Sequence, residues 1–124
     1  MVKKIISFQD LEVWQISHKF VLEIYKISSS FPENERYGLT SQIRRSAISV
    51  PANIAEGFVR RGRNEKIHFY NIAQASLHET KYYLILVQDL KFISSNSVLW
   101  AMSEEISKML HGLIESIKRN YATR

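Results

Sequence analysis

Apolar residues recur at helical spacing along almost the whole chain, and three short segments interrupt them. The interruptions are the Phe31–Pro32 pair, Gly62 and the ISSNS stretch at residues 93–97. The final periodic segment has an apolar arc ~100° wide, the width expected of the core-facing side of a helix. That arc contains Leu99, Met102, Ile106, Met109, Leu110, Leu113 and Ile117. The pattern predicts an all-α chain.

We expect helices at about residues 10–28, 38–61, 65–92 and 98–120, in one domain covering residues 1–124. Ser7 and Asp10 have the spacing of a capping box before the first helix, and Asn64 is a candidate N-cap of the third. Glycine (4) and proline (2) are too scarce for a fold rich in β-turns. Short links between helices predict an antiparallel up-and-down four-helix bundle.

The first helix is apolar over most of its circumference, because its polar residues form only a narrow stripe. A bundle core needs one face of a helix, so the second apolar face requires another cover. A second copy of the protein is the commonest cover, which predicts a homo-oligomer. The alternative is that this helix is the most central one of the bundle.

The second helix contains the segment SVPANIAEG at residues 49–57. Pro51 removes a helical hydrogen bond, so we expect a kink there, and Gly57 is expected to help end the helix. A stripe of polar side chains runs beside the core face: Gln42, Ser46, Ser49, Asn53 and Glu56. We interpret this stripe as a structural polar seam that fixes helix register or a subunit contact. The alternative is an ordinary exposed face, on which Glu56 pairs with Arg60.

Basic residues are concentrated between Arg36 and Lys66, where the net charge is +5, as large as that of the whole chain. Such a concentration favours a polyanionic partner, although basic residues also solvate helix ends. The candidate nucleic-acid-binding residues are Arg44, Arg45, Arg60, Arg61, Arg63 and Lys66. No aromatic residue interleaves this cluster, so we expect salt-sensitive binding with weak sequence selectivity.

The residues give no support for catalysis, a cofactor or a metal site. Glu65 and His68 form a single Glu-x-x-His motif, whereas a di-iron bundle needs two copies and further carboxylates. His18 falls in the apolar arc of the first helix and is expected to be a buried structural histidine. The sequence contains no cysteine, and neither a signal peptide nor an apolar stretch long enough to span a membrane is evident. These features predict a cytoplasmic protein.

Several segments together resemble one family over essentially the whole chain. They are FQDLEVWQ at 8–15, YKISSSFPENERYGLTSQIRRS at 25–46, SVPANIAEG at 49–57, FYNIAQASLHET at 69–80 and MLHGLIESIK at 109–118. The chain resembles the four-helix-bundle proteins encoded in intervening sequences of bacterial 23S ribosomal RNA genes. That family is similar to the accessory variability determinant of diversity-generating retroelements, a homopentameric ring that binds nucleic acid and a reverse transcriptase.

The resemblance implies a homopentamer and RNA or DNA binding, without an established activity. The rival hypothesis is an assembly scaffold whose partner is another protein and which has no nucleic-acid ligand. Nucleic acid that copurifies with the chain favours the first function, and capture of a polypeptide by a clean protein favours the second.

Overall fold

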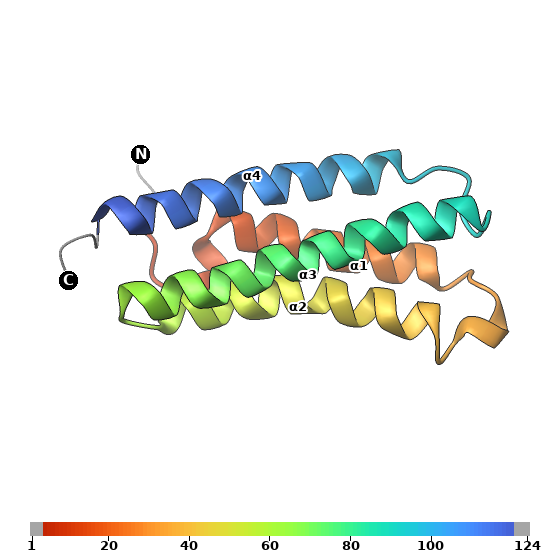
Figure 1. The fold of residues 1–124 in the computed structure, drawn as a ribbon, viewed down its shortest axis with the longest axis horizontal. Coiled ribbons are helices and arrows are strands. Elements are labelled where there is room, and N and C mark those ends of the chain that lie inside the picture. The colour runs from red at the N-terminus through yellow and green to blue at the C-terminus, as the bar shows by residue number, and fades with distance from the viewer. Residues whose placement is uncertain (1–3, 121–124) are drawn as a thin grey trace.

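A computed structural model describes residues 4–120, which contain four α-helices and no strand. The helices are α1 (Glu12–Ser28), α2 (Leu39–Val59), α3 (Arg63–Asp89) and α4 (Ser97–Asn120). Two short 3₁₀ helices, Phe8–Asp10 and Glu33–Glu35, precede α1 and α2. Each helix runs in the opposite direction to the one before it (Figure 1). The all-α, four-helix prediction is therefore confirmed.

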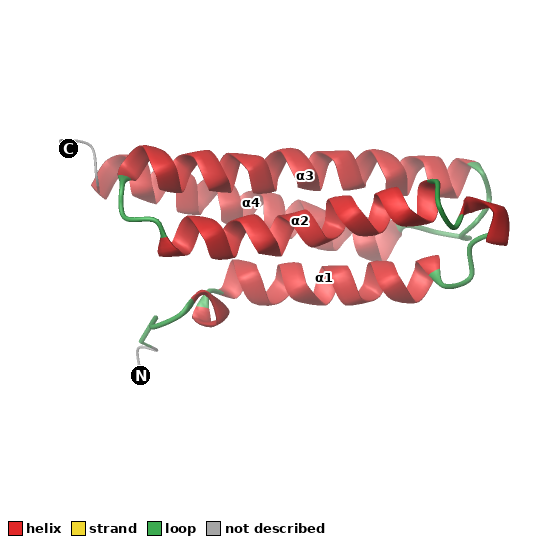
Figure 2. Ribbon diagram, turned by 90° about the horizontal axis from the view of Figure 1, so that it is seen from below, coloured by secondary structure: helices red, strands yellow, loops and turns green. Residues whose placement is uncertain are grey.

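The helices form a bundle in which each packs against two neighbours (Figure 2). Within residues 4–120, α2 packs against α1 and α3, and α4 packs against α3 and α1, while the backbones of the diagonal pairs stay apart. The largest fully buried side chains come from all four helices and include Tyr70, Phe20, Ile24, Ile43, Leu77 and Ile106. No helix among the described residues is apolar over a length sufficient to cross a membrane.

The start of α1 differs from the prediction. The Ser7–Asp10 capping box is present, but it caps the 3₁₀ helix Phe8–Asp10, and α1 begins two residues after Asp10. Leu11 has an extended backbone between the two elements, with φ −74° and ψ 127°. The cap therefore orients the short N-terminal turn instead of initiating the long helix.

The start of α3 also differs. Gly62 is the N-cap residue, in an extended conformation, and the Lys66 N–H donates to its carbonyl oxygen at 3.0 Å. Asn64 lies inside the helix, where its side chain accepts a hydrogen bond from Arg63, so its predicted role as N-cap is wrong. The predicted break at Gly62 is confirmed, and a link of three residues, 60–62, reverses the chain.

The segment SVPANIAEG lies wholly inside α2. The helix is continuous from Leu39 to Val59 through Pro51, and the kink expected there stays a prediction. Gly57 is buried and helical, and a Cβ atom added to it would lie 2.5 Å from Cε1 of Tyr70. The prediction that Gly57 ends the helix is wrong. It lets α3 approach α2 closely, and the helix ends two residues later.

Candidate nucleic-acid interface

The six cations predicted to bind nucleic acid fall into two groups on the bundle. Arg44 and Arg45 lie near the start of α2, whereas Arg60, Arg61, Arg63 and Lys66 lie around the turn from α2 to α3. A helix rises 1.5 Å per residue, so Arg44 and Arg60 are separated by about 24 Å along α2. The structure therefore does not bring the six together.

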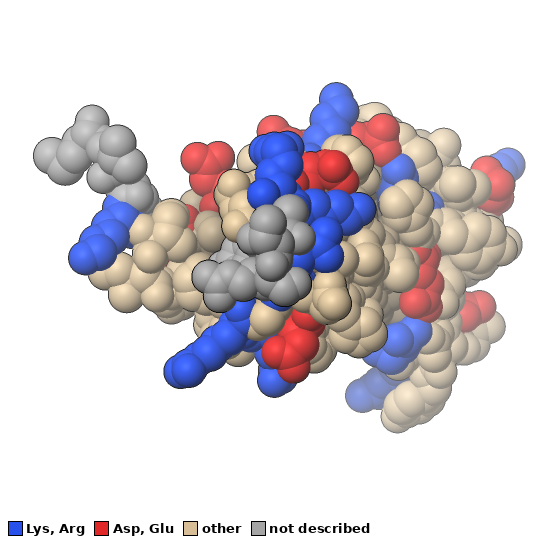
Figure 3. Space-filling model, turned by 60° about the vertical axis from the view of Figure 1, so that its left-hand side comes forward, with Lys and Arg blue, Asp and Glu red and all other residues tan. Residues whose placement is uncertain are grey.

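The group at the α2–α3 turn is joined by two further cations. The last turn of α4, which contains Lys118 and Arg119, reaches the same end of the bundle (Figure 1). We call this surface the basic end and define it as Arg60, Arg61, Arg63, Lys66, Lys118 and Arg119. Lys and Arg side chains gather at this end, with Asp and Glu side chains among them (Figure 3). Lys118 and Arg119 are not among the predicted cations, because the prediction considered only residues that are close together in the sequence.

Arg60 is held by two contacts from within the chain. It donates through Nη2 to the Glu56 carboxylate at 2.6 Å, as the i,i+4 spacing predicted. Its guanidinium also lies over the Phe69 ring, 4.9 Å from the centroid. Both members of the ion pair are substantially exposed, so the pair is worth only a few tenths of a kcal/mol, yet part of the Arg60 charge is balanced internally.

Lys66 is directed towards the end of α2. Its ammonium donates to the carbonyl oxygens of Gly57 (3.2 Å) and Phe58 (2.9 Å), which have no partner within the helix. The negative end of the α2 dipole favours a cation at this position. Partial burial lowers the pKa of Lys66 from its ordinary value. Lys66 is thus mainly a structural cap for α2 and only secondarily a cation available to a ligand.

Arg61 is the most available cation of the group. It is exposed, and within residues 4–120 it makes no hydrogen bond or ion pair. Arg63 is half-buried and donates to Asn64 at 3.0 Å. Aromatic rings accompany the cations here, because Phe69 lies under Arg60 and Phe58 lies 5.8 Å from the Lys66 amine. The expectation that no aromatic residues interleave the cluster is therefore wrong in three dimensions.

The predicted polar seam lies between α2 and α3 of the same chain. Asn53 donates to the Ser49 hydroxyl at 2.9 Å and to the Ser49 carbonyl at 2.8 Å, while Ser76 of α3 donates to Ser49 at 2.8 Å. One turn earlier, Thr80 donates to the buried Ser46 at 2.8 Å. These hydroxyl pairs fix the register of the two helices.

The two ends of the stripe do not belong to this seam. Gln42 is exposed and accepts hydrogen bonds from Arg45, which also forms an ion pair with Glu79 of α3 at 2.7 Å. Glu56 is exposed and paired with Arg60. The structure therefore separates a buried hydroxyl seam in the middle of α2 from charged pairs at its flanks.

An apolar groove lies between α1 and α2, on the side of α2 away from α3. Its volume is about 300 Å³, and it is lined by Phe8, Trp14, His18, Val21, Ile48, Pro51, Ala52 and Ala55. His18 is exposed and stacks on Trp14, with ring centroids 5.2 Å apart, so the prediction of a buried histidine is wrong. Leu22 of α1 is also 53% exposed, which leaves the broad apolar face of α1 only partly covered by the bundle.

No group of three or more metal-ligating side chains occurs within the part of the chain that the structure describes. Glu65 and His68 are both exposed at the start of α3, as expected for a solvated helix end. The arginines and lysines of the basic end can attract anions.

Comparison with known families gives a match over most of the chain. The sequence model of the family described as 23S rRNA-intervening sequence protein matches residues 9–112. The chain belongs to this family. The matched region contains both groups of predicted cations but stops before Lys118 and Arg119, so the α4 part of the basic end lies outside it.

The fold of the intervening-sequence family is also found among solved structures. A protein of unknown function from the S23 ribosomal protein family of Bacteroides thetaiotaomicron VPI-5482 has 30% sequence identity and a TM-score of 0.76. The similarity covers 82% of this chain and 97% of that one. A search of curated proteins found no match. The family identified from the sequence segments is thus confirmed.

Proposed function

We propose that the protein is a non-enzymatic, homo-oligomeric bundle that binds nucleic acid, RNA in preference to DNA, through its basic end. The observation that carries this proposal is the meeting of six cations at one end of the bundle, two from the α2–α3 link, two from α3 and two from α4. Lys and Arg side chains gather at this end (Figure 3). Arg61 and Arg119 have no ion pair within residues 4–120, so they are available for phosphate contacts. The preference for RNA rests on the family resemblance.

The expected mode of binding follows from the side chains present. Lysine and arginine neutralise phosphates without reading bases, so affinity depends strongly on salt and weakly on sequence. Glu56, Glu65 and Glu115 lie among the cations and limit the affinity of one copy. The resemblance to the accessory variability determinant favours a homopentamer, in which repeated basic ends bind one strand with avidity.

A charge reversal at Arg61 tests the nucleic-acid proposal. We expect Arg61→Glu to weaken binding of a single-stranded RNA oligonucleotide and to reduce the slope of log K against log salt by about one. Fluorescence anisotropy over a salt series measures both quantities. Lys19→Glu is the matched control, since Lys19 is exposed in the middle of α1 and undergoes the same change of charge. Equal losses in the two variants would show that only net charge matters and would refute a site at the basic end.

The second candidate function is an assembly scaffold with a protein as its only ligand. The α1–α2 groove favours it, because Trp14, Ile48 and Ala52 present an apolar surface that the bundle leaves partly exposed. Exposed apolar surface of this kind marks contacts between proteins. Under this function the protein binds no RNA at any salt concentration, whereas its self-association persists.

A further inference from the structure

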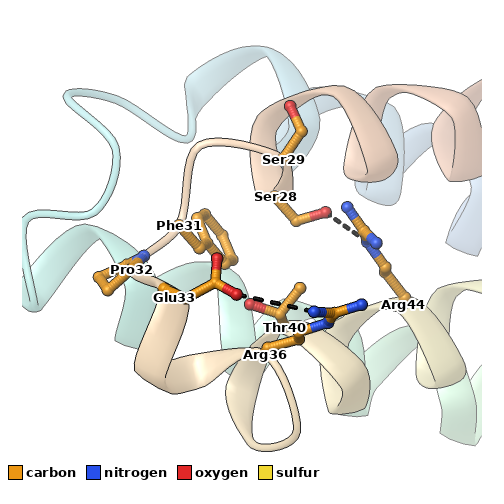
Figure 4. Close-up of a pocket in the computed structure, with 8 residues that line it drawn as sticks. All are labelled: Ser28, Ser29, Phe31, Pro32, Glu33, Arg36, Thr40 and Arg44. Carbon is orange, nitrogen blue, oxygen red and sulfur yellow. Dashed lines mark hydrogen bonds and ion pairs between the residues drawn. The ribbon is translucent and has the colours of Figure 1, made fainter.

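Three charged side chains, Arg36, Arg44 and Glu33, meet at the corner where α1 turns into α2. This corner is at the opposite end of α2 from the basic end. A hollow of about 170 Å³ is lined by Ser28, Ser29, Phe31, Pro32, Glu33, Arg36, Thr40 and Arg44 (Figure 4). Guanidinium groups enter it from two elements, Arg36 from the turn before α2 and Arg44 from the helix itself. Two cations and one carboxylate line this hollow, so its charge favours an anion.

Arg44 is oriented by the end of α1. Its Nε donates to the Ser28 hydroxyl at 2.7 Å, and Nη2 approaches the Tyr25 carbonyl oxygen at 3.4 Å. The guanidinium also stacks on the Tyr25 ring at 4.4 Å. These contacts fix the plane of the guanidinium and occupy one edge of it. An arginine held in this way is preorganised to bind a planar or tetrahedral oxyanion with its remaining N–H groups.

The Thr40 hydroxyl is a third polar group of the hollow that is available to an anion. Thr40 is 9% exposed, so it is nine-tenths buried, and its side chain makes no hydrogen bond with residues 4–120. It points into the hollow between Glu33 and Arg36 (Figure 4). The residue as a whole is largely buried, but its hydroxyl oxygen opens to solvent in the hollow. It is therefore free to donate its hydrogen to an anion oxygen bound there.

Glu33 is the one carboxylate that lines the hollow, and it competes only weakly for Arg36. The Arg36 Nη1 to Glu33 Oε1 distance is 3.7 Å, and the two side chains are 66% and 90% exposed. An exposed ion pair of this length contributes little, so a doubly charged phosphate can displace the carboxylate. The nearby Glu35 carboxylate accepts a hydrogen bond from the Leu39 N–H at the start of α2. Because Glu35 occupies this N–H group, the attraction for an anion comes from the two guanidinium groups.

A larger hollow of about 460 Å³ adjoins the first and shares Arg36, Thr40 and Arg44 with it. It is also lined by Tyr25, Tyr37 and Ile48. Tyr37 is 87% exposed, and the Arg36 guanidinium lies 5.5 Å from its ring centroid. Aromatic rings and guanidinium planes are the surfaces on which unpaired bases stack. A phosphate subsite thus lies beside a subsite suited to a base.

We propose that this corner binds a nucleoside monophosphate unit, with its phosphate between Arg36, Arg44 and Thr40 and its base against Tyr37. The unit is either a free mononucleotide or the phosphorylated end of an RNA strand. The site lies at the opposite end of the bundle from Arg61 and does not require RNA binding at the basic end.

Calorimetric titration of the intact protein with adenosine 5′-monophosphate, inorganic phosphate and adenosine tests the site. We expect the nucleotide to bind most tightly. Thr40→Val keeps the side-chain shape and should weaken nucleotide and phosphate binding about tenfold, as expected for a lost hydrogen bond to a charged group. Glu33→Gln removes the competing carboxylate and should strengthen both. Tyr37→Ala should weaken the nucleotide and leave inorganic phosphate unchanged.

Arg36→Gln and Arg61→Gln form a matched pair, because both change an exposed arginine in the same way at opposite ends of α2. We expect only the Arg36 variant to weaken the nucleotide. Equal losses in the pair, an unchanged affinity in Thr40→Val, or no binding of any phosphorylated probe would overturn the site. RNA oligonucleotides with and without a 5′-phosphate identify the source, since preference for the phosphorylated strand over the free nucleotide indicates a strand end. Failure of the basic end alone would instead appear in Arg61→Glu, with the nucleotide affinity intact.

Discussion

Gly57 shows how one residue sets the spacing of two helices. Its sequence context, AEG before an aromatic residue, suggested a helix end, but the structure places it against the ring of Tyr70 on α3. The Tyr70 ring is 2% exposed, so it has little space into which to move. The absence of a Cβ atom at this position is therefore a packing requirement between α2 and α3.

We predict that Gly57→Ala destabilises the protein by about 1–3 kcal/mol, the usual cost of overpacking a core. Gly112→Ala is the matched control, because Gly112 is an exposed position inside α4 and a Cβ there would meet no atom within 4 Å. The control should gain about 0.5–1 kcal/mol, since alanine favours a helix interior over glycine. Urea unfolding followed by circular dichroism measures both. A Gly57→Ala variant as stable as the parent would show that Tyr70 moves freely.

Helix ends are where the elements differ most from the prediction. The apolar period located four helices, because burial of one face repeats at every turn, but it is insensitive to how a helix stops. The end of α3 was expected near residue 92, and the helix ends at Asp89. Lys91 has φ 64°, and the N–H groups of Lys91 and Phe92 donate to Gln88 and Val87. This is a Schellman motif that uses lysine in place of glycine, so no glycine marks it in the sequence.

We predict that Lys91→Gly stabilises the protein by about 0.5–1 kcal/mol, because glycine adopts the left-handed conformation without the cost that a Cβ imposes. Lys91→Ala is the control, since it removes the same charged side chain and retains the Cβ atom. Thermal unfolding should raise the midpoint in the glycine variant and leave the alanine variant at or below the parent. A matching gain in both variants would attribute the effect to the charge of Lys91.

At the scale of the whole molecule, the sequence predicted the bundle better than its surfaces. The hydroxyl seam around Ser49 was recognised as hydrogen-bonding, but its partner Ser76 is 27 residues away and its place on α3 depends on the register of two helices. For the same reason, Arg44 and Arg60 looked like one basic cluster and lie at opposite ends of α2. A high density of charge along the sequence does not predict a high density of charge on the surface. A long helix separates in space residues that are close in the sequence.

Self-association is the property that separates the two proposed functions from a monomeric bundle. The monomer mass is 14.5 kDa, so a pentamer would have a mass of about 72 kDa. We predict a native mass near the higher value by light scattering at physiological salt. Ala52→Glu puts a charge on the apolar α1–α2 groove and should reduce the mass towards that of the monomer.

Ala101→Glu is the control for that substitution, because Ala101 is an exposed helical alanine on α4, outside the groove. It should keep the parent's mass, and circular dichroism should show the same helix content in all three proteins. If Ala52→Glu retains the parent's mass, the groove is not the contact and the subunits meet elsewhere. A parent mass of 14.5 kDa would remove avidity from the nucleic-acid proposal. The basic end would then have to bind RNA with the cations of a single copy, among which Arg61 and Arg119 are exposed and have no ion pair within residues 4–120.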